Sequence, residues 1–505
     1  MEAILRLPFD YANRVIDHRK ARYLVSALSG AGIALAFAPF YLWPALFLTS
    51  LFAFCLFNSE TKKEAVHQSL LFTFFLYMAN IYWVGNAFQV VGLGALSTLG
   101  YMGLPLYMAS TLIFASYLAW RFGRALSPVK KAILLGSLLN LAFVVDSFGE
   151  LAFPWVNYGY ALPLPLLQST SLWGIEGLSV LAVFASLLPF ARSRMYSISF
   201  AGIFVLLTAF GYWRLSEEGV GTPYNMRLIQ PSIKQETKWD PDQMQRNLQV
   251  QGLLSQMDAE KPVQAVLWPE ASVTFPLQRY PEIQKMLGNA APNGGHIFLG
   301  TLRESDDKVY TSLVVLNDQG LVKGAYDKKH LVPFGEYVPF RQLMPGVAKL
   351  THGARDFTPG TLPGVMSVEG LPPFRALICY EAIFSREINA ASPVQPEWLF
   401  NMTNDAWYGQ SSGPYQHLRI VTVRAIEQGL PLVRVANNGI SAVVDPYGRI
   451  QHKLELDDVG VIDFNLPKAL TGTFYGEYGQ VVAVLLILAL GMSAIFVSLR
   501  RKARD

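Results

Sequence analysis

The feature that most constrains this chain is a set of long apolar runs separated by short loops. A helix needs about 20 mostly apolar residues to cross the hydrocarbon core of a bilayer. Eight runs approach or reach this length, at roughly 22–40, 43–58, 67–88, 97–121, 131–147, 169–191, 196–213 and 478–498. The first run is too long, and too closely followed by a second, to be a cleaved signal peptide. We therefore expect eight transmembrane helices, seven of them before a long polar segment and one after it.

Among the termini and the loops that join the apolar runs, lysine and arginine are confined to alternate segments. This bias marks the cytoplasmic side of a membrane protein. The 17 basic residues in question are Arg6, Arg14, Arg19, Lys20, Arg22, Lys62, Lys63, Arg121, Arg124, Lys130, Lys131, Arg192, Arg194, Arg500, Arg501, Lys502 and Arg504. The intervening loops, near 41, 89–96 and 147–168, contain none. Basic residues that were merely solvated would not alternate in this way. The pattern predicts that both termini are cytoplasmic and that the polar segment lies on the opposite side.

Charge density divides the chain into a membrane domain (1–213, spans 1–7), an extracytoplasmic domain (214–477) and a last helix with a basic tail (478–505). Residues 1–213 hold 13 Lys/Arg and 8 Asp/Glu, whereas residues 214–477 hold 24 and 28. The central segment thus has a net charge of −4 (24 − 28), unlike a nucleic-acid-binding domain, which would be basic. An apolar fraction of 52% excludes a disordered or collagen-like chain.

The central segment reads as an α/β or α+β domain. Short apolar runs alternate with helical patterns, and glycine and proline fall between them as turn signals. The predicted strands are 226–230, 264–270, 296–302, 311–318, 374–380, 398–405, 433–438 and 441–448, with helices over 241–257 and 415–429. The runs are almost continuously apolar, so we expect sheets that helices cover.

The chain has few residues that could bind a metal or form a disulfide. The two cysteines, Cys55 and Cys379, fall in the membrane part and the central domain, so we expect two free thiols. The seven histidines form no metal-binding spacing, and no phosphate-binding or dinucleotide-binding motif is present. We therefore expect chemistry from side chains alone, with no metal and no cofactor.

Three segments place reactive residues at the end of an apolar strand, where α/β folds present catalytic groups. They end in Glu270, in Lys328 with the following Glu336, and in Cys379. A cysteine becomes a nucleophile when a nearby cation stabilises its thiolate, and a lysine can also hold an oxyanion. A glutamate can take the thiol proton and return it to a leaving group. Together these groups suit covalent acyl transfer, although taken singly each is commonly a core or surface residue.

These segments resemble the Glu-Lys-Cys triad of the nitrilase (carbon–nitrogen hydrolase) superfamily, and the longer motifs resemble its apolipoprotein N-acyltransferase family. The motifs are YDKKHLVPFGEYVP (326–339), TKWDP (237–241), NDAWYG (404–409), RAIEQGLPLVRVANNG (424–439) and FPWVNYGY (153–160). The eight-span layout, with the polar domain before the last span, matches as well. The resemblance implies an αββα sandwich for the central domain.

The resemblance also implies a role for each candidate residue. Glu270 corresponds to the general base, Lys328 to the oxyanion-stabilising lysine and Cys379 to the nucleophile, while the adjacent Lys329 is the alternative to Lys328. Supporting roles fall to Glu336, which would orient the triad, and to Tyr380 and Glu381, which follow the nucleophile. Trp239 resembles a tryptophan on a mobile loop near the substrate entrance; its alternative is ordinary aromatic packing.

For function, the resemblance implies N-acylation of lipoproteins in the inner membrane of a bacterium, with the catalytic domain periplasmic. The donor would be a phospholipid, through the sn-1 chain of phosphatidylethanolamine, and the intermediate a thioester on Cys379. The acceptor would be the α-amino group of the diacylglyceryl-cysteine of an apolipoprotein. We expect a monomer in the lipid bilayer, with no nucleic-acid partner.

Some positions depart from the family pattern or lie outside its motifs. Thr311 stands after Tyr310 where the family often has asparagine, and no arginine follows Glu150 before Phe153. The uncharged aromatic loop 147–168 suits a membrane interface, as an aromatic belt or a lipid-contacting surface. The segment 338–352 is rich in apolar residues for a loop, and we hypothesise that it forms part of a lid.

Two other functions would fit parts of the sequence. A membrane-tethered amidase would use the same triad on a soluble amide, but one anchor would then suffice. A transporter with a degenerate domain would place ionisable residues within its spans. Here the acidic residues of that kind, Asp146, Glu150 and Glu176, lie near span ends.

Overall fold

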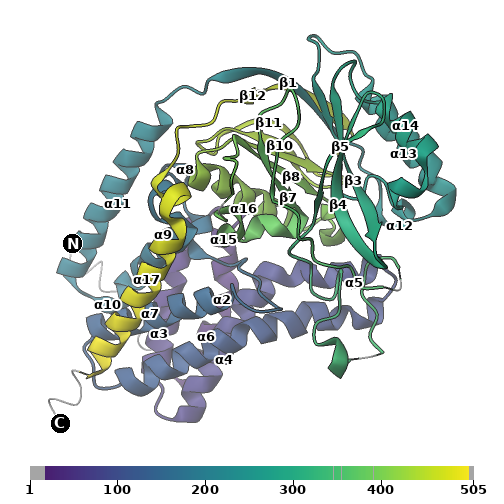
Figure 1. Cartoon of the computed structure of the whole chain (residues 1–505). Helices are drawn as coiled ribbons and strands as arrows, with labels where there is room; N and C mark the ends of the chain where they lie inside the picture. The colour runs from purple at the N-terminus through teal and green to yellow at the C-terminus, as the bar shows by residue number, and fades with distance from the viewer. Residues whose placement is uncertain (1–17, 345, 354, 391, 500–505) are drawn as a thin grey trace. The chain divides into compact units, whose positions relative to one another are not determined.

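The computed structural model describes residues 18–344, 346–353, 355–390 and 392–499 (Figure 1). The chain forms two compact units. Unit 1 comprises Met1–Gly85, Thr98–Trp213 and Gln480–Asp505, and unit 2 comprises Asn86–Ser97 and Arg214–Gly479. Of the basic residues used to predict topology, Arg6, Arg14, Arg500, Arg501, Lys502 and Arg504 lie outside the described residues.

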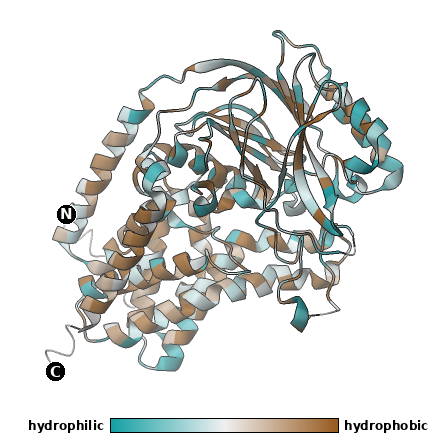
Figure 2. Ribbon diagram, viewed as in Figure 1, coloured by the Kyte–Doolittle hydropathy of each residue, from teal (hydrophilic) through white to brown (hydrophobic). Residues whose placement is uncertain are grey.

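Unit 1 is built from helices. They are α2 (Arg19–Ile33), α3 (Leu48–Phe57), α4 (Lys62–Ile81), α6 (Leu104–Gly123), α7 (Pro128–Val145), α8 (Leu164–Leu167), α9 (Thr170–Ser186), α10 (Leu188–Ala191), α11 (Arg194–Leu215) and most of α17 (Phe474–Leu499). Figure 2 shows most of α17 beyond its first turns in the colour of hydrophobic residues. Buried polar pairs join several of these helices, as in the Arg22–Glu64 ion pair between α2 and α4. Inside a bilayer such groups need partners of this kind.

Among the described residues, four helical stretches are long and apolar enough to span a membrane: Lys62–Val90, Gly94–Gly123, Pro128–Val145 and Arg194–Leu215. Shorter apolar helices cover Trp43–Phe57, Thr170–Ser186 and Val484–Phe496. The expected run 22–40 is a shorter helix, since α2 ends at Ile33 and irregular turns follow. Pro39 and Pro44 lack the backbone donor that a continuous helix requires. The prediction of eight spans therefore remains a prediction.

Most of the aromatic loop 147–168 packs inside unit 1, although Phe148 at its start is exposed. Trp155 is buried, and its ring centroid lies 4.8 Å from that of Trp83. Tyr158 is also buried, and its hydroxyl lies 3.0 Å from that of Thr49. The expectation of an aromatic belt or lipid-contacting surface was wrong for these side chains, because their large apolar area is used in the packing of unit 1.

Unit 2 contains two six-stranded sheets. The first has the order β12 (Gly460–Pro467), β1 (Gly221–Gln230), β2 (Ala265–Leu267), β3 (His296–Ser305), β4 (Lys308–Asn317), β5 (Val322–Asp327). The second has the order β11 (Ile450–Leu454), β10 (Ser441–Val444), β9 (Leu432–Ala436), β8 (Trp398–Thr403), β7 (Phe374–Ile378), β6 (Val365–Met366). Within them, β1–β2–β3 and β7–β8–β9 run parallel.

The two sheets pack face to face and helices cover their outer faces. Between the sheets, Phe298 of β3 packs with Phe374 of β7 and Phe400 of β8. On the outer face of the first sheet lie α13 (Pro241–Ser255) and α14 (Pro281–Gly288), and on that of the second lies α16 (Gly413–Gln428) (Figure 1). The central strands of each sheet are buried on both faces, which explains their continuous apolar runs. These are the layers of an αββα sandwich.

A short segment of the helical region belongs to unit 2. Residues Asn86–Ser97 include the short helix α5 (Asn86–Val90), and the Asn86 side-chain amide donates a hydrogen bond to the main-chain oxygen of Tyr408 at 2.8 Å.

Candidate active site

Three strands of unit 2 end next to the predicted reactive residues. Glu270 follows β2 after two residues, whereas Lys328 and Cys379 directly follow β5 and β7. All three are buried, with exposed fractions of 7%, 1% and 7%. Ionisable groups are costly to bury, so a buried cluster of them marks a candidate functional site.

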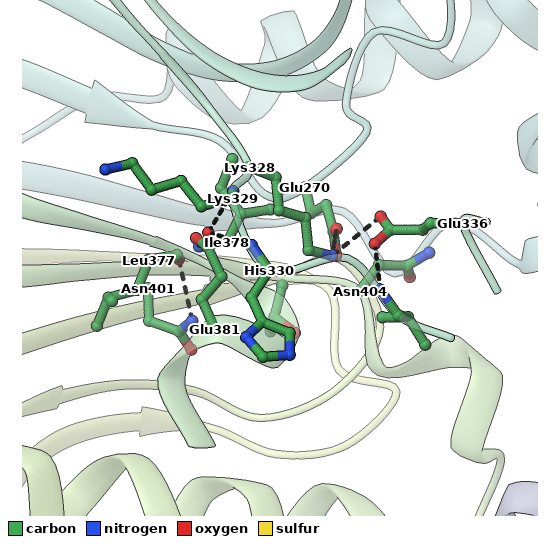
Figure 3. Close-up of polar contacts among 12 residues, drawn as sticks. Glu270, Lys328, Lys329, His330, Glu336, Leu377, Ile378, Glu381, Asn401 and Asn404 are labelled. Atoms are coloured by element: carbon green, nitrogen blue, oxygen red, sulfur yellow. Dashed lines mark hydrogen bonds and ion pairs between the residues drawn. The ribbon is translucent and has the colours of Figure 1, made fainter. Parts of the chain in front are cut away.

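Lys328 is held between two carboxylates. Its Nζ atom lies 3.0 Å from Oε1 of Glu336 and 3.4 Å from Oε1 of Glu270 (Figure 3). Burial by itself lowers the pKa of Lys328, but the two carboxylates outweigh it and the pKa is raised. The main-chain N–H of Lys328 donates to the Thr311 carbonyl at 2.9 Å, so the departure at Thr311 leaves this backbone support intact. Lys328 is therefore a fixed, permanently charged donor.

Glu336 is fixed by its own loop. Its Oε2 atom accepts a hydrogen bond from the main-chain N–H of Val332 at 2.8 Å, and its own N–H donates to the Val332 carbonyl at 2.8 Å. Because Oε1 contacts Lys328, Glu336 determines where the ammonium lies.

Cys379 begins the short helical turn η9 (Cys379–Ile383) at the end of β7, with a φ of 51°. This left-handed conformation is strained for a residue with a side chain and is typical of functional sites. The Glu270 carboxylate lies close enough to the thiol to act on its ionisation. Burial, with the Glu270 charge adding to it and Lys328 opposing it, raises the pKa of Cys379 to about 12. The thiol is thus protonated at neutral pH and needs a base to become a nucleophile.

Glu270 has the position of that base. Burial raises the pKa of its carboxyl group, and Glu336 adds to this effect, while Lys328 and Lys238 oppose it. A carboxylate with a raised pKa is a better proton acceptor than one in water. The same carboxylate contacts the ammonium of Lys328 and acts on the ionisation of the Cys379 thiol.

Glu381 links the cysteine turn to the lysine segment. Its Oε2 atom accepts from the main-chain N–H of Ile378 at 2.7 Å. Its Oε1 atom accepts from the main-chain N–H groups of Lys329 (2.7 Å) and His330 (3.2 Å) (Figure 3). It also accepts from the hydroxyl of Tyr326 at 2.8 Å. Four donors thus converge on one buried carboxylate.

The other predicted residues lie around this cluster. Lys329 is exposed, so of the two adjacent lysines it is Lys328 that lies among the carboxylates. Tyr380 is buried, and its ring packs edge-on against His330. Trp239 is half-buried and stacks on His352, at the end of the expected lid segment, with 5.6 Å between ring centroids.

Two features of the site had no role in the sequence analysis. Lys238 is buried, and its Nζ atom donates to the main-chain oxygen of Glu270 at 3.0 Å. Asp405 is buried between Arg434 and His417, and it accepts from the hydroxyl of Thr403 at 3.0 Å. Lys238 falls within the motif TKWDP and Asp405 within NDAWYG. Their membership of these motifs is the sequence signal that could have marked them as candidates.

Within residues 18–344, 346–353, 355–390 and 392–499, no group of three or more His, Cys, Asp or Glu side chains could hold a metal ion. In the same ranges Cys55 and Cys379 are free thiols.

A two-sheet sandwich with a buried cysteine, lysine and glutamate at its strand ends defines a nitrilase-like domain. Residues 226–474 match the carbon–nitrogen hydrolase family, and residues 29–188 match the apolipoprotein N-acyltransferase N-terminal domain. The chain is 35% identical to the apolipoprotein N-acyltransferase of Rhodopseudomonas palustris, covering 92% of this chain and 93% of that protein. It is 33% identical to that of Rickettsia typhi, covering 92% of this chain and 95% of that protein. The chain belongs to the apolipoprotein N-acyltransferase family.

Solved structures match about half of this chain. An amidase from Nesterenkonia sp. is 21% identical and covers 50% of this chain and 94% of its own, with a TM-score of 0.37. A CN-hydrolase superfamily protein from Xanthomonas campestris is 17% identical and covers 50% of this chain and 91% of its own, with a TM-score of 0.37.

Proposed function

We propose that this protein moves an acyl chain from a membrane phospholipid to the α-amino group of the diacylglyceryl-cysteine at the N-terminus of an apolipoprotein. The observation that carries the proposal is the buried cluster in which the Glu270 carboxylate contacts the Lys328 ammonium and acts on the ionisation of the Cys379 thiol. Family membership supplies the substrates, since the relatives are named apolipoprotein N-acyltransferases.

In the first half-reaction, Glu270 takes the thiol proton and the sulfur of Cys379 attacks the ester carbonyl. The Lys328 ammonium stabilises the oxyanion that develops on the carbonyl oxygen. The tetrahedral intermediate then breaks its carbon–oxygen bond, and Glu270 returns the proton to the leaving glyceryl oxygen. The products are a lysophospholipid and a thioester on Cys379.

In the second half-reaction, the α-amino group attacks the thioester carbonyl. Glu270 takes a proton from the attacking nitrogen and returns it to the sulfur as the carbon–sulfur bond breaks. Lys328 again stabilises the oxyanion. The sequence is ping-pong, with one residue alternating between base and acid.

The membrane arrangement is part of the same proposal. Both substrates carry acyl chains in the bilayer, so we place the catalytic domain on the periplasmic face with both termini cytoplasmic. Eight spans are supported by four long and three shorter apolar helices together with α2. Water must be kept from the thioester, and the segment 338–352, with exposed Phe340, Leu343 and Val347, suits a lid in contact with lipid.

The test uses phosphatidylethanolamine with a deuterated chain at either sn-1 or sn-2, and a synthetic diacylglyceryl-cysteine peptide. The purified protein in detergent should transfer the sn-1 label to the peptide amine, and Cys379→Ala should transfer none. Transfer of the sn-2 label would contradict the proposed donor position. Release of free fatty acid without peptide acylation would contradict the proposed acceptor and favour a hydrolase.

A further inference from the structure

Lys238 is a buried lysine that the proposed mechanism does not use. It ends the short helix α12 (Gln235–Lys238) and is only 2% exposed, whereas Lys234, which directly precedes α12, is exposed. Its Nζ atom donates to the main-chain oxygen of Glu270 at 3.0 Å. An ammonium group is costly to remove from water unless nearby groups compensate its charge. Its place next to the candidate base therefore needs an explanation.

The segment that carries Lys238 is attached to the ends of the second sheet. The Asn437 side-chain amide donates to the Ile233 carbonyl at 2.8 Å, and the Ser232 N–H donates to the Asn437 carbonyl at 2.9 Å. The Asn404 amide donates to Oε1 of Gln235 at 2.8 Å. Since Asn404 and Asn437 follow β8 and β9, the ammonium of Lys238 is presented from a fixed backbone.

Glu270 lies in a tight turn. The next residue, Ala271, has a φ of 49°. Gly300 of β3 packs so closely that a Cβ atom there would lie 2.6 Å from the Ala271 nitrogen and 2.7 Å from the Pro269 oxygen. The turn thus directs the Glu270 carbonyl to Lys238 while its carboxylate contacts Lys328.

The charges around Glu270 balance only when Lys238 is counted. The titratable groups with the largest effects on its carboxyl group are Lys328, Glu336, Lys238 and Cys379. The buried Tyr408 also interacts electrostatically with Glu270. Lys328 is shared between two carboxylates, so it supplies one positive charge for two negative ones. Lys238 supplies the second. Glu381 is separately satisfied by its four donors.

We propose that Lys238 is a positioning residue for the general base, which fixes the main chain of Glu270 and, as a cation, keeps its carboxylate ionised. This inference rests on the proposed role of Glu270 as base. Burial, opposed by Glu270, lowers the pKa of Lys238 to about 7. The charge of Lys238 therefore acts mainly below pH 7, where Glu270 is otherwise most easily protonated.

The test measures alkylation of Cys379 by iodoacetamide between pH 5 and 9, on the full-length protein in detergent, with peptide mass spectrometry to separate Cys379 from Cys55. Loss of the Lys238 charge makes Glu270 easier to protonate, so Lys238→Met should slow alkylation about tenfold near pH 6, the effect of one pKa unit on Glu270. The difference should shrink above pH 7. Lys238→Arg should keep the wild-type profile, as should the matched control Lys234→Met.

Thermal unfolding shows whether Lys238→Met is folded. If it is not, Lys238→Gln, which keeps a hydrogen-bond donor without the charge, takes its place in the test. A shifted acid limb in Lys238→Gln supports the proposal. A wild-type profile in a folded charge-free variant overturns it. Because alkylation needs no phospholipid, the two proposals fail separately: a shifted profile without acyl transfer contradicts only the proposed function, and acyl transfer with an unshifted profile contradicts only the role of Lys238.

Discussion

Oε1 of Glu381 lies 2.7 Å from the main-chain nitrogen of Lys329. The other oxygen of the same carboxylate lies 2.7 Å from the main-chain nitrogen of Ile378. One buried side chain therefore fixes the residues next to Lys328 and next to Cys379 at once. The distance between the lysine and the cysteine is set by Glu381 as well as by the sheets that carry them.

Glu381→Gln should weaken both the fold and the site. The amide nitrogen would have to face at least one N–H or O–H that now donates to a carboxylate. An unsatisfied buried polar group costs about 1–3 kcal/mol, so the free energy of unfolding should fall by that amount, with slower alkylation of Cys379. Thermal or chemical unfolding checks this against the exposed control Glu397→Gln. Equal stability of the two variants would contradict the linking role.

Lys328→Met and Lys329→Met should differ sharply although the residues are adjacent. Loss of one oxyanion donor typically costs about 10²–10³-fold in rate, and Lys328→Met also leaves Glu270 and Glu336 without their shared cation. Lys329→Met should remain close to wild type, since that side chain is exposed. Initial rates of acyl transfer measure both. Similar losses in the two variants would argue against the assignment of Lys328.

Replacing Phe340, Leu343 and Val347 together by serine tests the lid. These side chains are 51%, 81% and 41% exposed. Two lost methylene contacts with lipid are worth about 1.6 kcal/mol, so acylation of Cys379 by phospholipid should fall at least about tenfold. Alkylation by iodoacetamide should change little. Leu253→Ser, at an exposed apolar position on α13, is the matched control; equal losses in both reactions would speak against a lid.

The ion pairs of Asp405 with Arg434 and His417 should stabilise the fold to a degree that depends on pH. Burial alone raises the pKa of Asp405, but Arg434 and His417 outweigh it and lower the pKa to about 2. A carboxyl group with a lowered pKa stabilises the fold above its unfolded pKa near 4, and this contribution is lost as the pH falls towards 2. Asp405→Asn should cost about 3–5 kcal/mol at pH 6.

The measurement is the free energy of unfolding of wild type and Asp405→Asn at several pH values between 6 and 2. The difference should shrink as the pH falls below about 4, because the unfolded wild type then binds a proton that folded Asp405 does not bind until the pH approaches 2. A difference that stayed constant over this range would show that Asp405 is not ionised in the folded protein.

Part of this fold and site could be predicted from sequence because the information is local. The central strands are buried on both faces, so their apolar runs end abruptly before Glu270 and Cys379. The peripheral strands β5, β6, β11 and β12 were not predicted. In β11 (Ile450–Leu454) most side chains are exposed, so its sequence pattern carries little hydrophobic signal.

Other features depend on contacts between distant residues. From sequence, a lysine in the polar segment around Lys238 is expected to be exposed to solvent, and only the fold brings it against Glu270. Asp405 meets Arg434 through the pairing of β8 with β9, which a single sequence does not reveal. The assignment of Lys328 over Lys329 came from resemblance, and burial gives its physical basis.

The most direct test of the central claim is intact-protein mass spectrometry after incubation with phosphatidylethanolamine and no acceptor. We predict a mass increase of one acyl chain on the wild type, removed by hydroxylamine and absent from Cys379→Ala. An acyl adduct that persisted in Cys379→Ala, or no adduct on a wild type that still acylated the peptide, would contradict a thioester on Cys379 as the intermediate.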